Sequence, residues 1–106
     1  MSLLYEQHGA VAVLTLSRPQ QRNAWGDDFH TALKQIVPEL EVNKDIRCVV
    51  LTGDEAGGAF CAGANLQQKK DGPADGKGPG AGVILESLYH PLLRRLRDLP
   101  CPMIAA

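Results

Sequence analysis

The sequence contains 106 residues, of which 44% are apolar, so it has the length of one domain and enough apolar side chains for a modest core. Its formal net charge is −1 at pH 7, from 11 basic and 12 acidic side chains. Because there is no excess of positive charge, the composition argues against a protein that binds nucleic acid or an anionic membrane through its overall field.

The N-terminal residues show no targeting signal. Met1 to His8 lack the basic start and long apolar stretch of a secretory leader, and no apolar run in the chain reaches bilayer-spanning length. We therefore expect a cytoplasmic protein. The three cysteines, Cys48, Cys61 and Cys101, are odd in number and form no CxxC pair. This usage is typical of reduced thiols and argues against a disulfide framework or a metal site.

Two apolar, β-branched runs predict strands. Ala10 to Leu16 follows a glycine and predicts a strand that is buried on both faces, with Tyr5 to His8 pairing beside it as a short hairpin. Ile46 to Thr52 predicts a second buried strand, and the polar residues 43–45 before it predict a turn.

A helix is predicted between these two strands, because apolar residues recur there with the period of one buried helical stripe. The stripe consists of Trp25, Phe29, Leu33, Ile36 and Leu40. Pro38 lies inside the pattern and removes a backbone hydrogen bond, so we expect a kink or a break near Val37. Strand, helix and strand together predict a crossover unit of an α/β fold.

The second half of the chain contains a Gly/Pro-rich stretch and a further helix. Seven of the eleven residues from Gly72 to Gly82 are Gly or Pro, so we expect a flexible loop at 72–82. A stripe of leucines from Leu85 to Leu99 predicts a helix that Pro91 should kink and Pro100 should end. The apolar residues from Pro102 to Ala106 predict the start of another strand.

The segment Phe60 to Leu66 consists largely of small residues and has no clear period. Small side chains let a ligand approach the backbone, and Gly63 tolerates conformations that are closed to other residues. If a helical turn starts near Asn65, its free N–H groups would favour a negative charge at that point. A tightly packed loop without a binding role is the alternative that composition leaves open.

Four ordered blocks of the sequence resemble the N-terminal part of the enoyl-CoA hydratase/isomerase family, also called the crotonase family. The blocks are residues 14–19 (LTLSRP), 22–24 (RNA), 49–53 (VVLTG) and 59–66 (AFCAGANL), and residues 99–106 resemble the lead-in to the family's next block. The resemblance implies an α/β fold in which residues 1–106 are the N-terminal part of a crotonase-like spiral of ββα units. It also implies a homotrimer or hexamer for the full-length protein.

By this resemblance, the substrate is an acyl-CoA thioester, and the reaction passes through an enolate whose oxygen is held by two backbone N–H groups. The residue after the glycine of the 60–66 segment supplies one donor, which implies that the backbone N–H of Ala64 forms part of the oxyanion hole. Losing such a donor typically lowers the rate by about 10²–10³. The family usually carries aspartate where this chain has Asn65, whose neutral side chain can still cap a helix. Coenzyme A is part of the substrate, so no separate cofactor is expected.

The resemblance also implies contacts with CoA from two segments. Arg22 borders the CoA nucleotide in the family, and a guanidinium can hold phosphate oxygens in a bidentate fork. A solvated loop arginine is the alternative. The other contact residues that the resemblance implies are Ala24, Cys61, Ala62, Gly63, Asn65 and Leu66. Lys69 and Lys70 are weaker candidates for the same phosphates.

Several other side chains are compatible with a catalytic role that we do not assign. Cys61 lies in the candidate segment, but the sequence places no histidine beside it, and we expect it to act as a small buried hydrophobe. His30 and His90 lie on predicted helices and are expected at the surface or lining a pocket. Glu86 and His90 are four residues apart, so they could face the acyl pocket or form an ordinary pair on a helix surface.

The groups that decide the chemistry are expected beyond Ala106, where the resemblance puts the second oxyanion donor and the acid/base carboxylates. We therefore expect the full-length protein to be an enoyl-CoA hydratase, with double-bond or ring isomerisation of an enoyl-CoA as the alternative, and residues 1–106 alone to be inactive. A non-catalytic acyl-CoA-binding or interaction protein with the same fold is a further alternative. An NTPase phosphate loop at 53–58 is excluded because no Gly-Lys-Ser/Thr follows the glycines.

Overall fold

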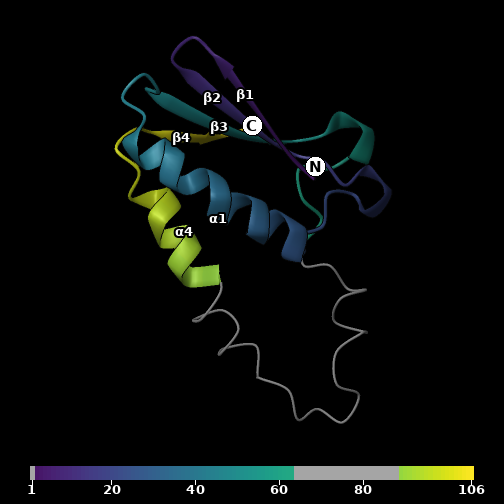
Figure 1. Cartoon of the computed structure of the whole chain (residues 1–106). Helices are drawn as coiled ribbons and strands as arrows, with labels where there is room; N and C mark the ends of the chain where they lie inside the picture. The colour runs from purple at the N-terminus through teal and green to yellow at the C-terminus, as the bar shows by residue number, and fades with distance from the viewer. Residues whose placement is uncertain (1, 64–88) are drawn as a thin grey trace, which may run out of the picture.

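The computed structural model describes residues 2–63 and 89–106, which form a four-stranded sheet and two α-helices (Figure 1). The strands are β1 (Leu3–His8), β2 (Val11–Leu16), β3 (Cys48–Gly53) and β4 (Met103–Ala105). The helices are α1 (Asp27–Val42) and α4 (His90–Arg97), and the short 3-10 helices η1 (Pro19–Gln21) and η2 (Glu55–Gly57) lie in the connections. Figure 1 shows α1 and α4 together on one side of the sheet.

The strands follow one another across the sheet in the order of the sequence, β1-β2-β3-β4. β1 and β2 form an antiparallel hairpin in which His8 pairs with Val11, and Gly9 makes the turn with a left-handed φ of 61°. This confirms the predicted hairpin. β2 and β3 are parallel and are connected through α1, which confirms the crossover unit. β4 lies parallel to β3 at the edge of the sheet, so the strand expected within residues 102–106 is confirmed.

Only one face of the sheet is fully buried by the described residues. On β2, every second side chain, namely Ala12, Leu14 and Leu16, is completely buried, whereas the intervening side chains are half-buried. The prediction that residues 10–16 are buried on both faces is therefore wrong for this part of the chain. The physical reason is that α1 and α4 cover one face of the sheet (Figure 1).

Helix α1 confirms the predicted apolar stripe. Phe29, Leu33 and Leu40 are buried, and Val37 is buried with them. The helix continues past Pro38, so the break that was one of the two expected outcomes is wrong. Proline in a helix interior costs about 3 kcal/mol. Each fully buried large apolar side chain stabilises the fold by about 1.5–3 kcal/mol, so the stripe on both sides of the exposed Pro38 outweighs its cost.

Helix α4 begins at His90, so Pro91 stands in its first turn. The residues that would accept a helical hydrogen bond from this position lie within 64–88, outside the described residues. The kink expected at Pro91 therefore stays a prediction. Leu92 and Leu96 are buried against the core, and Arg95 forms an ion pair with Glu41 that links α4 to α1.

Residues 64–88 lie outside the described part of the chain. The loop expected at 72–82 and the helix start expected near Leu85 therefore stay predictions. Within residues 2–63 and 89–106, no helix is both long enough and apolar enough to cross a bilayer.

Candidate functional site

Two loops begin at the same edge of the sheet. β2 and β3 are parallel, so their carboxyl ends lie together. Residues 17–26 follow β2 and residues 54–63 follow β3. In open α/β sheets, ligands bind outside the carboxyl ends of the strands, and both loops contain residues that the sequence singles out for CoA. This edge is the candidate functional site.

The loop after β2 contains two consecutive residues in the left-handed region. Arg22 has a φ of 53° and Asn23 a φ of 59°. This conformation costs about 1–2 kcal/mol for a residue with a Cβ atom, although asparagine adopts it more readily than most. The backbone N–H of Asn23 donates to the carbonyl of Arg18 over 2.9 Å, and the N–H of Ala24 donates to Gln21 over 3.0 Å. The loop is thus a tight, internally bonded turn that presents the exposed Arg22.

Asn23 is fully buried and holds three parts of the chain together. Its Oδ1 accepts a hydrogen bond from the backbone N–H of Arg18 over 2.8 Å. Its Nδ2 donates to the backbone carbonyls of Asp54 over 3.1 Å and of Ala59 over 2.8 Å. Sequence reasoning gave Asn23 no role of its own, although it stands in the RNA block of the family resemblance. Neither that block nor the preference of asparagine for the left-handed region reveals partners more than thirty residues away.

Asp54 is the first residue of the second loop, and its hydrogen bonds fix the loop to the end of β2. The Ser17 hydroxyl donates to its Oδ2 over 2.7 Å, and the N–H of Ala56 donates to its Oδ1 over 3.0 Å. These two hydrogen bonds, that of Ser17 first, lower the pKa of Asp54 below its ordinary value. The N–H of Asp54 also donates to the carbonyl of Leu16, so β2 and the loop after β3 are joined at their ends.

Two glycines make room for the loop after β3. A Cβ atom at Gly53 would lie 2.4 Å from the carbonyl oxygen of Phe60 and 2.7 Å from that of Ala59. A Cβ atom at Gly57 would lie 2.7 Å from Nδ2 of Asn23. Any larger residue at either position would push the chain or the buried amide aside.

The end of the second loop lies against the first loop along its backbone. The N–H of Ala62 donates to the carbonyl of Arg22 over 3.1 Å, and the N–H of Trp25 donates to the carbonyl of Gly63 over 2.7 Å. The structure thus brings the predicted site residues Arg22, Ala62 and Gly63 together, and all three are exposed. The half-buried Cys61 packs partly against the core.

The remaining predicted site residues differ in what the structure describes. Ala24 is buried beside the paired segments. Gly63 has a φ of 105°, which only glycine adopts readily. Ala64, Asn65 and Leu66 lie outside the described residues, as do Lys69, Lys70 and Glu86, so their roles stay predictions.

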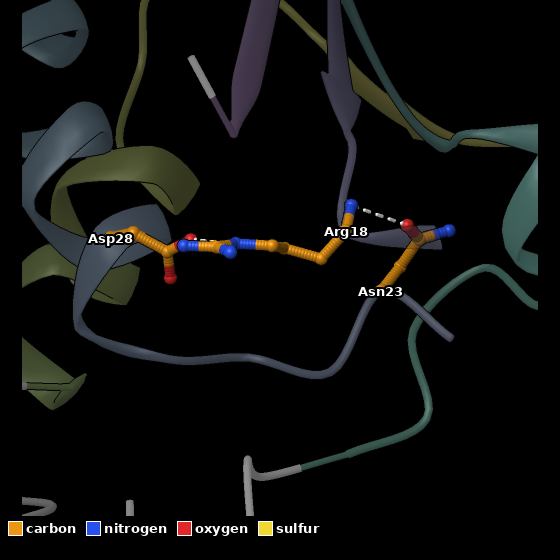
Figure 2. Close-up of polar contacts among 3 residues, drawn as sticks. All are labelled: Arg18, Asn23 and Asp28. Atoms are coloured by element: carbon orange, nitrogen blue, oxygen red, sulfur yellow. Dashed lines mark hydrogen bonds and ion pairs between the residues drawn. The ribbon is translucent and has the colours of Figure 1, made fainter. Parts of the chain in front are cut away.

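Arg18 connects the turn to the start of α1, as Figure 2 shows. Its Nε donates to Oδ2 of Asp28 over 2.5 Å, while its backbone N–H points at Asn23. Partial burial disfavours the charged form of Asp28, but hydrogen bonds from Ser2 and Arg18 outweigh it, so the pKa of Asp28 lies below its ordinary value. A carboxylate in the first turn also complements the helix dipole.

The two histidines lie in different surroundings. His30 is only 8% exposed, so the surface position that was one of its two expected places is wrong. Its ring meets that of Tyr89 edge to face at 5.7 Å, and burial, followed by the charge of Lys34, lowers its pKa. His90 is half-buried and borders a shallow surface depression formed with Leu93, Arg94 and Arg97 of the same helix.

The thiols and acidic groups form no further centre in the part of the chain that is described. Cys61 packs partly against the core, and its Sγ lies 3.8 Å from the carbonyl of Gly63. Cys48, Cys61 and Cys101 are all unpaired. Between residues 2–63 and 89–106, no group of three or more His, Cys, Asp or Glu side chains is placed to hold a metal ion. The candidate site offers the exposed guanidinium of Arg22, a group that binds carboxylate and phosphate oxygens.

Comparison with known proteins identifies relatives that share this sequence and fold. The family model described as enoyl-CoA hydratase/isomerase matches residues 6–106. The chain is 42% identical over 96 residues to the 1,2-epoxyphenylacetyl-CoA isomerase of Escherichia coli (strain K12), and the matched region covers 91% of this chain and 36% of that protein. It is 33% identical over 106 residues to the short-chain-enoyl-CoA hydratase of Clostridium acetobutylicum, which covers 99% of this chain and 38% of that protein.

Solved structures agree with these relatives. Pseudomonas aeruginosa AtuE matches with a TM-score of 0.83 and 30% identity, over 99% of this chain and 39% of that one. An enoyl-CoA hydratase from Bacillus anthracis matches with a TM-score of 0.80 and 25% identity, again over 99% and 39%. The α/β fold class, as the N-terminal part of the crotonase fold, is thereby confirmed, and the chain spans less than two fifths of the length of these four proteins. The chain belongs to the enoyl-CoA hydratase/isomerase (crotonase) family.

Proposed function

We propose that the complete protein containing this chain is an enoyl-CoA hydratase that holds the enolate of an acyl-CoA thioester in an oxyanion hole. One observation carries the proposal. The backbone of residues 59–63 is hydrogen-bonded to the turn of residues 22–25 at the carboxyl edge of β2 and β3. Two segments that are far apart in the sequence thus form one surface, and both contain residues for which the family resemblance implies CoA contacts.

In this proposal the two segments have different roles. Arg22 is exposed on the turn and binds a CoA phosphate through its guanidinium. Backbone atoms of Cys61, Ala62 and Gly63, followed by Asn65 and Leu66, line the path of the thioester, with Ala24 behind them. The N–H of Ala64 donates to the enolate oxygen. Because coenzyme A enters with the substrate, no further cofactor is proposed.

A second candidate function is isomerisation of an enoyl-CoA or of a related ring compound. It is favoured by the 42% identity to a protein named 1,2-epoxyphenylacetyl-CoA isomerase. The carboxylates that separate hydration from isomerisation are proposed to lie beyond residue 106. A non-catalytic acyl-CoA-binding protein is the third candidate, and a homotrimer or hexamer in the cytoplasm is the proposed state of the complete protein.

The test uses the complete gene product with three compounds: a 2-enoyl-CoA for hydration, a 3-enoyl-CoA for double-bond isomerisation and 1,2-epoxyphenylacetyl-CoA for ring isomerisation. Ala64→Pro removes the proposed donor and should lower kcat by about 10²–10³, whereas Ala64→Gly keeps the N–H and should retain most activity. Proline also restrains the backbone, so the thermal midpoint and the affinity for CoA are measured for both variants.

The results separate the candidates. Turnover of the 2-enoyl-CoA alone supports the hydratase, and turnover of the 3-enoyl-CoA alone supports the isomerase. Turnover of 1,2-epoxyphenylacetyl-CoA alone supports isomerisation of a ring compound, and binding of acyl-CoA without turnover of any of the three compounds supports the non-catalytic alternative. A folded Ala64→Pro variant that binds CoA and works at the parent rate would refute the oxyanion role of Ala64.

A further inference from the structure

The amide of Asn23 is matched on every side by backbone groups. Its oxygen meets an N–H, from Arg18, and its nitrogen meets two carbonyl oxygens, from Asp54 and Ala59. Reversing the amide would place its nitrogen against a donor and its oxygen against two acceptors, so the surroundings fix a single orientation. At 0% exposure, no water competes for these contacts.

The partners of Asn23 distinguish it from an asparagine that only shapes a turn. Asn43, in the turn after α1, accepts a hydrogen bond from the N–H of Asp45, two residues away, which is the usual local pattern. Asn23 instead reaches residues 31 and 36 positions further along the chain, in the loop after β3. It therefore acts on the position of that loop as well as on its own turn.

The loop after β3 is held at three points between Ala59 and Gly63. The carbonyl of Ala59 accepts from the side chain of Asn23, the N–H of Ala62 donates to Arg22, and the carbonyl of Gly63 accepts from Trp25. Only the first of these uses a side chain. Substitution of Asn23 can thus release the segment while the backbone groups of the other two contacts remain present.

We infer that Asn23 is a positioning residue, which sets the place of residues 59–63 and thereby the direction of the N–H that follows Gly63. The inference rests on the proposed function, because the N–H in question is the proposed oxyanion donor of Ala64. Asn23 touches no substrate in this account. Its loss misaligns the donor relative to the bound thioester, and misplacement of a reacting group by about 1 Å can cost about 10²-fold in rate.

The experiment compares Asn23→Gly with Asn43→Gly in the complete gene product. Glycine accepts the left-handed φ of position 23 without strain, so Asn23→Gly removes the amide and leaves the turn accessible. Asn43→Gly removes an asparagine that bonds only locally, and it should leave activity unchanged. Gly57→Ala is a second way to disturb the same amide, since its Cβ atom would lie 2.7 Å from Nδ2 of Asn23. It keeps the test decisive if Asn23→Gly does not fold.

Three measurements are made on protein that circular dichroism shows to be folded. Hydrogen exchange in peptides covering residues 22–26 and 59–63 should become faster by about tenfold in Asn23→Gly, because the segment loses a buried hydrogen bond. The kcat should fall by about 10–100-fold with KM changed much less, as expected when a transition-state contact is lost. In Asn23→Gly, the stretching frequency of the thioester C=O group of a bound, unreactive acyl-CoA should shift away from its value in the parent protein and toward its value in water.

Each contrary result overturns a defined part of the inference. Unchanged exchange in both peptides shows that Asn23 does not hold the segment. Faster exchange with an unchanged kcat and an unchanged C=O stretch shows that its role is structural only. If the parent protein does not bind acyl-CoA, the proposed function fails and the catalytic part of the inference fails with it. The exchange data then still decide whether Asn23 positions residues 59–63.

Discussion

Replacing Gly53 by alanine tests the close approach of the two chain segments at the end of β3. The added Cβ atom would lie 2.4 Å from the carbonyl oxygen of Phe60, 2.7 Å from that of Ala59 and 2.8 Å from the Cα atom of Phe60. All three neighbours are backbone atoms, so no side chain can rotate away. An ordinary contact begins at 3.4 Å, and the loop must therefore shift by about 1 Å to accept the methyl group.

The expected cost has two parts. Overpacking of this kind destabilises a protein by about 1–3 kcal/mol. The shift also moves the carbonyl of Ala59 away from the amide of Asn23, and a buried polar group without its partner costs about 1–3 kcal/mol. Because a partial shift relieves the first part at the expense of the second, we expect a loss of about 2–4 kcal/mol rather than the full sum.

The assay is urea unfolding of the complete gene product, followed by circular dichroism, with the slope of the transition checked for two-state behaviour. Gly9→Ala is the matched control. A Cβ atom at Gly9 would meet nothing within 4 Å, but φ there is +61°. Gly9→Ala should therefore lower the free energy of unfolding only by the strain of a left-handed alanine, about 1–2 kcal/mol. Faster hydrogen exchange in residues 59–63 should accompany Gly53→Ala and not Gly9→Ala. The reasoning is refuted if the free energy of unfolding of Gly53→Ala lies within about 0.5 kcal/mol of the parent value and hydrogen exchange in residues 59–63 is unchanged.

Three further predictions concern the core, the pH dependence and the ligand. Phe29→Ala should destabilise the protein by about 3–5 kcal/mol in urea unfolding, because Phe29 is completely buried and packs edge to face on Trp25 at 5.8 Å; a loss below about 1 kcal/mol would contradict its place in the core. The lowered pKa of Asp54 means that its hydrogen bonds stabilise the fold above the ordinary carboxyl pKa of 3.8 and are lost as the pH falls through the lower, folded value. Ser17→Ala should therefore raise the pKa of Asp54 in an NMR titration, and an unchanged titration would show that Ser17 is not the cause. Arg22→Ala should raise KM for acyl-CoA more than it lowers kcat, since a remote phosphate contact is mostly uniform binding; an unchanged KM at low and moderate salt would remove Arg22 from the site.

The elements that repeat a simple pattern could be predicted from the sequence. The stripe of α1, the two strands around it and the final strand each depend on the period of apolar residues, which burial against one core enforces. The rule for proline wrongly allowed a break near Pro38, because that local rule does not weigh a lost hydrogen bond against the burial of Val37 and Leu40. Strand β3 also begins two residues later than predicted, since the buried Ile46 belongs to the turn before it.

The candidate site could be predicted only in part. The resemblance singled out Arg22 and residues 61–63, and the structure brings them together. It did not single out the groups that hold them there. Three side-chain hydrogen bonds of Asn23 and Asp54 join residues 31 to 37 positions apart, and no local pattern marks the two ends of such a contact. A fully buried asparagine and a half-buried one, such as Asn23 and Asn43, look alike until the fold is known.

The hydrogen bonds of the candidate site have a consequence for the order of events during synthesis. They join residues 16–25 to one another and to residues 54–63, so none of them requires α4 or β4 to be present. At about 5–20 residues per second, the ribosome needs seconds to add each further stretch of chain. The candidate site can therefore close around Asn23 while the remainder of the protein is still being made, and later segments then assemble on a surface that is already formed.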